Sequence, residues 1–135
     1  MTSKNLSFTA VLAALFLAGC SMEPKGSVRI VSINPEPVTV LRVGQEVEME
    51  AVVEYTMDGK RGQINLVVQT KEGEPLNETA EAVELTQSSG TVTLRRSFEI
   101  PETAELHAFV PLYAGAKARK TGIVDSRTYN IAPKK

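Results

Sequence analysis

Residues 47–55, VEMEAVVEY, decide the fold class of this chain. Apolar side chains occupy every second position, and glutamates fill three of the four positions between them. Successive side chains of a β-strand point to opposite faces, so this alternation predicts a strand with one buried and one solvated face. The predicted buried set is Val47, Met49, Ala51, Val53 and Tyr55.

The segments on either side continue the strand pattern. Before the central strand, VRIVSI at 28–33 predicts a strand that ends at a proline-rich segment. After it, Asp58-Gly59 is a strong signal for a β-hairpin that leads into QINLVVQT at 63–70. The next turn is expected at KEGEP, residues 71–75.

The second half of the chain predicts further strands. Val83-Glu84-Leu85 reads as a short edge strand, and Ser88-Ser89-Gly90 as a plain turn. Residues 91–100 alternate again, but Arg96 falls on their apolar side. Two explanations stay open: the head group of Arg96 leaves at the sheet margin, or the strand contains a bulge.

The last strands are predicted at 106–113 and 123–131. LHAFVPLY at 106–113 is apolar on both faces, as in a central strand, and Pro111 is expected at its end or at a bulge. Residues 77–82 are compatible with one helical turn or a loop.

About seven strands with turns every 8–12 residues predict an all-β fold, a single antiparallel β-sandwich. Over residues 28–131 the pattern resembles immunoglobulin-like and fibronectin type III domains, without the Cys…Trp…Cys signature of antibody domains. A small barrel is the alternative. The expected core includes Val53, Leu66, Leu94 and Phe98.

The N-terminus has the order of features found in bacterial export signals. Lys4 precedes an apolar stretch, Leu6 to Ala18, which is too short to span a bilayer as a helix. Leu17-Ala18-Gly19-Cys20 then resembles the lipobox of bacterial lipoproteins. The resemblance implies cleavage before Cys20 and acylation of Cys20, with palmitate as an expected acyl group, so that covalent lipid anchors the chain in the membrane.

This reading divides the chain into four parts. Residues 1–19 are the expected signal peptide, 20–27 the lipidated cysteine and a polar tether, 28–132 the β-sandwich domain, and 133–135 a tail. Ser21 follows the cysteine, where an aspartate favours retention in the inner membrane. The resemblance therefore implies a cell-envelope location, with the outer membrane, facing the periplasm or the surface, favoured over the inner membrane.

The formal net charge of −1 argues against general nucleic-acid binding. The charge is unevenly distributed: residues 43–105 carry 13 acidic and 5 basic side chains, and residues 106–135 carry 6 basic and 1 acidic. Within the basic part, Lys117, Arg119 and Lys120 lie in one expected loop, with Arg127 in the next strand. The three loop cations, Lys117, Arg119 and Lys120, form the candidate binding site, for phosphate-rich lipid, an acidic glycan or an acidic protein.

Catalytic chemistry has few candidates. His107 is the only histidine and is expected to be partly exposed or hydrogen-bonded on a strand. Cys20 is the only cysteine and is assigned to lipid, while Ser88-Ser89-Gly90 lacks the Gly-x-Ser-x-Gly elbow of serine hydrolases. Glu48, Glu50 and Glu54 are interpreted as a solvated sheet face rather than a calcium site. We therefore expect no enzymatic activity, no cofactor and no metal.

Two functions are compatible with these features. The first is a lipid-anchored envelope module that binds an envelope protein or glycan through edge strands or loops. The alternative is an accessory subunit of an envelope secretion or surface-assembly complex. Both place the membrane among the partners, through lipid on Cys20.

Overall fold

The computed structural model describes residues 26–76, 82–115 and 119–135, and this part of the chain contains strands and no helix. No described segment is therefore a helix that could cross a membrane. The nine strands are β1 (Gly26–Asn34), β2 (Leu41–Arg42), β3 (Glu46–Met57), β4 (Gly62–Ile64), β5 (Val67–Thr70), β6 (Val83–Leu85), β7 (Ser89–Glu99), β8 (Glu105–Ala114) and β9 (Arg119–Ala132).

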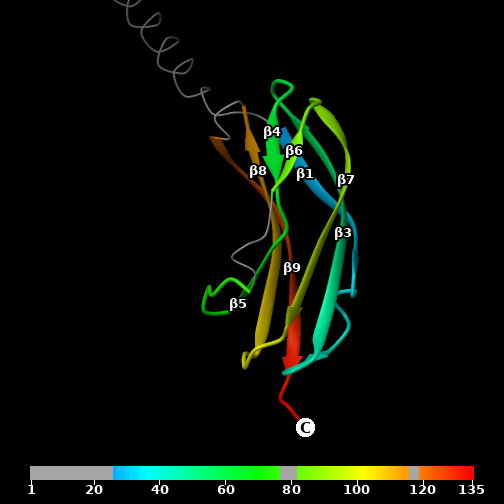
Figure 1. Ribbon diagram of the computed structural model, residues 1–135, viewed down its shortest axis with the longest axis vertical. Helices are drawn as coiled ribbons and strands as arrows, with labels where there is room; N and C mark the ends of the chain where they lie inside the picture. Colours follow the sequence, from blue (N-terminus) through cyan, green and yellow to red (C-terminus); the bar gives the residue numbers. More distant parts are fainter. Residues whose placement is uncertain (1–25, 77–81, 116–118) are drawn as a thin grey trace, which may run out of the picture.

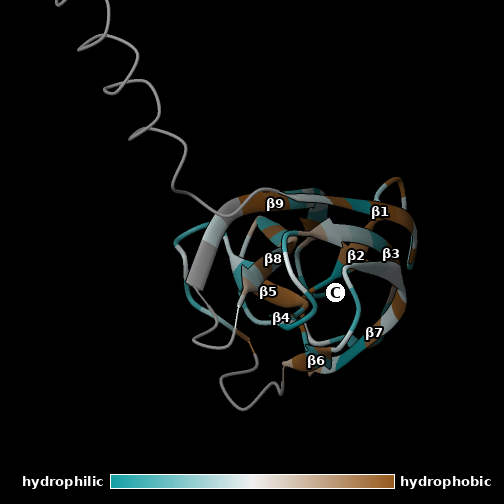
Figure 2. Ribbon diagram, turned by 90° about the horizontal axis from the view of Figure 1, so that it is seen from above, coloured by the Kyte–Doolittle hydropathy of each residue, from teal (hydrophilic) through white to brown (hydrophobic). Residues whose placement is uncertain are grey.

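The strands form two sheets packed face to face (Figures 1 and 2). One sheet has the order β1-β3-β7, and the other has the order β2-β9-β8-β4-β6, with β5 also paired to β8. All pairings are antiparallel except that of β2 with β9. This arrangement confirms the predicted β-sandwich over the barrel, and the described residues form nine strands where about seven were predicted.

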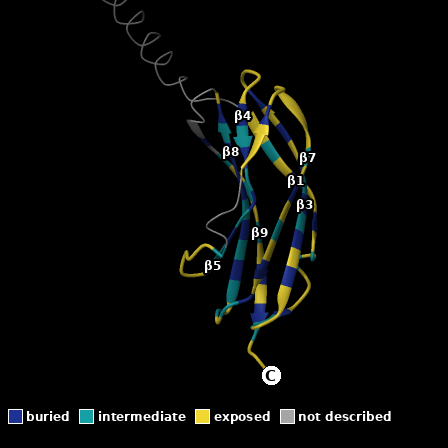
Figure 3. Ribbon diagram, viewed as in Figure 1, coloured by how far each residue is buried: buried dark blue, intermediate teal, exposed yellow. Residues whose placement is uncertain are grey.

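The core lies between the two sheets, where the inward-facing residues of the alternating strands meet (Figure 3). The predicted inward face of β3 is confirmed, because Met49, Ala51 and Val53 are completely buried. The four predicted core residues are also buried, with exposed fractions of 0% for Val53, 0% for Leu66, 2% for Leu94 and 9% for Phe98.

The predicted hairpin at Asp58-Gly59 is wrong. Gly59 does adopt the left-handed conformation that a tight turn requires, with φ of 84°. The turn, however, carries the chain from β3 in one sheet to β4 in the other. Both edges of β3 are already occupied, by β1 and β7, so β4 has no free edge of β3 to pair with.

Three smaller predictions are resolved. Ser89 and Gly90 are the first residues of β7, opposite Thr56 and Tyr55, so the predicted turn at 88–90 is too long. Pro111 lies at a bulge of β8, where the pairing register with β9 shifts. β1 starts at Gly26, two residues inside the predicted tether.

Arg96 shows why a cation lies on the apolar side of β7. The β3–β7 register has no shift, so the bulge explanation is wrong. The Nε of Arg96 instead donates to the carbonyl oxygen of Leu66 at 2.9 Å, and a terminal nitrogen donates to Oδ1 of Asn65. Because β7 is the margin of its sheet, the guanidinium reaches across to the segment between β4 and β5 in the other sheet. Partial burial lowers the pKa of Arg96.

Candidate binding surfaces

The outward face of the β1-β3-β7 sheet is polar, as the glutamates of β3 predicted. Two of these glutamates are paired across strands: Glu54 accepts from Arg29 at 2.7 Å, and Glu50 accepts from Arg95 at 2.8 Å. The hydrogen bond from Arg29 to Glu54 raises the pKa of that guanidinium, and the charge attraction adds to the effect. The solvated-face interpretation is therefore confirmed, with the addition of cross-strand ion pairs.

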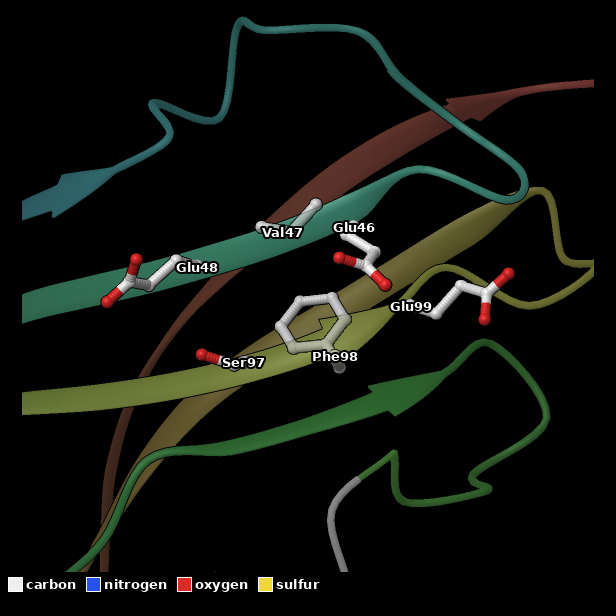
Figure 4. A pocket seen from close by; sticks show the side chains of 6 residues that line it. All are labelled: Glu46, Val47, Glu48, Ser97, Phe98 and Glu99. Carbon is white, nitrogen blue, oxygen red and sulfur yellow. The ribbon is translucent and has the colours of Figure 1, made fainter.

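At one end of this face, β3 and β7 form a groove that the sequence did not predict (Figure 4). The hollow has a volume of about 510 Å³. It is lined by the start of β3 and the end of β7, through Glu46, Val47, Glu48, Ser97, Phe98 and Glu99. Because only two neighbouring strands line it, the hollow is an open groove and not an enclosed pocket.

The groove is acidic. Glu46 and Glu99 are exposed and lie directly opposite each other in the β3–β7 ladder, with Glu48 two residues further along β3 (Figure 4). Like charges at opposite positions of an antiparallel pair repel each other. Among the ion pairs of the described residues, none involves these three glutamates. The groove therefore presents uncompensated negative charge on the outward face of the sheet.

A second hollow, of about 680 Å³, lies near the start of β1, where the β1-β3-β7 sheet meets β9 of the other sheet. Val28, Tyr55 and Val124 contribute its apolar part, and the Arg29–Glu54 ion pair lies at its margin. Tyr55 is anchored by a hydrogen bond from its hydroxyl to the carbonyl oxygen of Gln87 at 3.3 Å. This hollow is therefore lined by residues of both sheets.

The predicted site residues are only partly placed. Cys20 and Lys117 lie outside the described residues. Arg119 is the first residue of β9 and lies opposite Ala114, and Lys120 lies opposite Tyr113. The structure describes the backbone of these two residues and not their side chains. The end of β8 at Ala114 and the start of β9 at Arg119 lie at the end of the sandwich at which β1 begins.

Arg127, in the middle of β9, has partners of its own. Its guanidinium contacts Oδ1 of Asp125 at 2.9 Å and donates to the carbonyl oxygen of Ile30 at 3.2 Å. Asp125 in turn accepts a hydrogen bond from the Ile30 amide at 2.8 Å. Partial burial acts to raise the pKa of Asp125, but the Ile30 and Arg127 hydrogen bonds outweigh it and hold the pKa below its usual value. Arg127 is therefore a structural residue at the junction between the sheets.

Sequence reasoning missed a second pair of cations at the same end. Lys60 and Arg61 lie in the β3–β4 turn and are exposed. The amide of Gly115, at the β8–β9 hairpin, donates to the Arg61 carbonyl oxygen at 2.7 Å, which holds the turn beside the hairpin. The sequence separates the two by more than 50 positions, so only the fold brings them together.

The single histidine is placed as expected. His107 is half-buried on β8, opposite Thr128, whose hydroxyl lies 3.4 Å from the ring Nδ1. Within residues 26–76, 82–115 and 119–135, no group of three or more His, Cys, Asp or Glu is placed to hold a metal ion.

No model of a known protein family matches this sequence, and no curated protein sequence matches it. Solved structures of similar shape exist. The C-terminal domain of wzt superposes with a TM-score of 0.53 at 13% identity, over 85% of this chain and 81% of that one. The β-sandwich of the present chain is therefore immunoglobulin-like in its fold.

A second similar structure is the CARDB domain of a Pyrococcus furiosus protein, solved in complex with di-metal ions. It has a TM-score of 0.51 at 11% identity, over 83% of this chain and 96% of that one. At such low identities, both similarities show the shared fold alone.

Proposed function

We propose that this chain is a lipid-anchored, non-enzymatic module of the cell envelope that binds a protein partner through the acidic groove of β3 and β7. The observation that carries the proposal is the pair Glu46 and Glu99, held directly opposite each other beside Glu48. Their mutual repulsion weakens the strand pair, and a cationic segment of a partner would relieve it. Residues that bind a ligand commonly lower the stability of the protein when the ligand is absent.

The groove lies at the end of the domain opposite to the end that would follow the proposed lipid anchor. Gly26, where the described chain begins, pairs with Met57 at the end of β3, whereas the groove lies at the start of β3. Twelve residues of extended strand separate the two ends by about 35 Å. A chain anchored at Cys20 would therefore hold the groove at the far end of the domain from the membrane.

A binding role without catalysis is supported by the chemistry of the surfaces. The acidic groove lies open on two adjacent strands, and the ring of His107 faces a threonine hydroxyl rather than a nucleophile paired with a carboxylate. The similar solved structures add support at the level of the fold alone.

The anchor is tested by fractionation. Cys20→Ala should leave the chain uncleaved or release it to the soluble periplasmic fraction, whereas the unchanged chain stays with the outer membrane after a high-salt wash. Recovery of a cleaved Cys20→Ala chain in washed membranes would contradict lipid anchoring.

The groove is tested by crosslinking and pull-down of the mature protein from its own envelope. Glu46→Gln with Glu99→Gln should reduce recovery of the crosslinked protein partner, and added salt should do the same. The matched control is Glu72→Gln with Glu74→Gln, which removes equal charge from two exposed residues of the turn after β5. Equal recovery with both double variants, or capture of a neutral glycan instead of a protein, would reject the proposed site.

A further inference from the structure

The outward face of the larger sheet differs in chemistry from the charged face of the β1-β3-β7 sheet. On β8, Ala108 and Val110 are completely buried, so the alternating residues His107 and Phe109 point outward. The strand register places these two residues between β5 and β9, in two cross-strand rows. The rows are Val67–Phe109–Ser126 and Gln69–His107–Thr128, and we name them together the neutral grid.

None of the six side chains of the neutral grid is charged, and all six are half-buried or exposed. Along β8 the grid is followed on one side by Pro111, opposite the exposed Val124, and on the other side by Glu105. The outward face of the β1-β3-β7 sheet, in contrast, has charged side chains on all three strands. A charged ligand would lose hydration on the grid without meeting an opposite charge, so the charge match favours a neutral ligand.

The polar row of the grid can donate and accept hydrogen bonds. The side-chain amide of Gln69 makes no hydrogen bond within the described part of the chain. The imidazole of His107 contacts the Thr128 hydroxyl through Nδ1, at 3.4 Å, which leaves Nε2 for a ligand. An amide, a neutral imidazole and a hydroxyl each contain donors and acceptors, and so does every hydroxyl group of a sugar. The row therefore matches a ligand with several neighbouring hydroxyl groups.

The other row adds an aromatic surface beside these polar groups. Phe109 is half-buried, and its neighbour on β9 is the short, exposed Ser126, which leaves space for a ligand beside the ring. The face of an aromatic ring is negatively polarised and attracts the C–H groups of a sugar ring. With strands about 4.8 Å apart and rows about 7 Å apart, the grid covers about 10 Å by 7 Å. A disaccharide unit can cover such an area.

We propose that the neutral grid is a binding site for a neutral glycan, with a sugar ring stacked on Phe109 and its hydroxyl groups hydrogen-bonded to Gln69 and His107. The site goes beyond the proposed protein-binding groove. Because the two sheets are packed face to face, the grid and the groove lie on opposite sides of the domain (Figure 2). The domain would therefore hold a protein on one face and a glycan on the other.

The test is isothermal titration calorimetry on the full chain, purified in a zwitterionic detergent so that no sugar headgroup competes. The probes are cellotetraose, chitotetraose and mannotetraose, with tetragalacturonate as the anionic comparison. Phe109→Leu removes the ring and keeps an apolar side chain, Phe109→Tyr keeps the ring, and Gln69→Ala removes the amide. The matched control is Val52→Ala, which shortens a half-buried outward side chain of β3, opposite Thr93.

We expect at least one neutral tetrasaccharide to bind at millimolar concentration without loss at high salt, and tetragalacturonate not to bind. Phe109→Leu and Gln69→Ala should each lower the association constant at least about fivefold, whereas Phe109→Tyr and Val52→Ala should leave it within about twofold. Circular dichroism confirms that each variant is folded. Binding of none of the neutral probes, tighter binding of tetragalacturonate, or equal affinities of Phe109→Leu and Phe109→Tyr would overturn the glycan site.

A further variant separates this site from the acidic groove. Glu46→Gln with Glu99→Gln should leave sugar binding unchanged, because both glutamates lie on the other sheet. A loss of sugar binding in this double variant would assign the sugar to the groove and overturn the grid. A failure of the groove to capture a protein partner, with sugar binding intact, would contradict the proposed function and leave the grid standing.

Discussion

Replacing Arg96 with methionine tests how the two sheets are held together. The guanidinium of Arg96 leaves the margin of the β1-β3-β7 sheet and donates to acceptors at Leu66 and Asn65 in the other sheet. It also donates to the carbonyl oxygen of Arg95 at 2.6 Å. Methionine has a similar unbranched stem without the charge, so the substitution removes these hydrogen bonds and keeps most of the apolar contact.

The expected loss of stability in Arg96→Met is the balance between the hydrogen bonds that are lost and the contacts that are kept. A hydrogen bond from a charged donor contributes about 1.5–3 kcal/mol net, and a partly buried acceptor left without its donor adds a further cost. Two effects oppose this loss. Partial burial already lowers the pKa of Arg96, which shows that the folded state desolvates its charge, and the methionine stem retains contact with the core. We therefore expect Arg96→Met to lower the free energy of unfolding by about 2 kcal/mol.

The neighbouring arginine supplies the control. Arg95 lies on the opposite face of the same strand and pairs with Glu50, with exposed side-chain fractions of 64% and 45%. An exposed ion pair contributes little, so Arg95→Met should cost less than about 0.5 kcal/mol. Urea denaturation at 25 °C measures both variants, and the Arg96 variant should show a midpoint lower by roughly 1 M. Equal midpoints for the two variants would refute the idea that Arg96 joins the sheets.

Three further predictions concern the core, a buried tyrosine and the groove. Alanine at each of the four predicted core positions should cost about 2–5 kcal/mol in urea denaturation, and a loss below about 0.5 kcal/mol at two of them would contradict the strand register. These positions are Val53, Leu66, Leu94 and Phe98. Burial raises the pKa of Tyr129 to about 12, above its value of about 10 in an unfolded chain. The folded state thus holds the phenolic proton more tightly, and this stabilisation is present below pH 10 and lost as the pH rises toward 12. Tyr129→Phe, which removes the 2.6 Å hydrogen bond to the Pro35 carbonyl oxygen, should be less stable at pH 7 but lose less stability between pH 10 and 12; parallel pH profiles would exclude this titration. Glu99→Gln should raise the free energy of unfolding by a few tenths of a kcal/mol at low salt by relieving its repulsion with Glu46; a loss of stability would show that Glu99 has a stabilising partner.

The strands and the core were predictable because the signal for them is local. Alternation along 47–55 fixes which side chains share a face, whatever the strand pairs with. This alternation does not determine which strand pairs with which. Asp58-Gly59 specifies a tight turn, but the same turn serves a hairpin or a crossing between sheets. Only the occupation of both edges of β3, by β1 and β7, decides that the chain must cross.

The candidate groove could not be predicted for the same reason. Glu46 and Glu99 are more than 50 positions apart in sequence and become neighbours through the β3–β7 register. A shift of one residue would place their side chains on opposite faces. The structural role of Arg127 could not be predicted either, because its guanidinium donates to the Ile30 carbonyl oxygen, 97 positions away in the sequence.

The Ile30 junction links the first strand of the domain to the last. In β1 the register with β3 shifts between Ile30 and Ser32, so the ladder is interrupted there. At this interruption, Asp125 accepts from the Ile30 amide and Arg127 donates to the Ile30 carbonyl oxygen. Both partners belong to β9, the strand that starts at Arg119. The junction therefore holds β1, the outer strand of one sheet, against β9 of the other sheet, and it ties the first strand of the domain to the last.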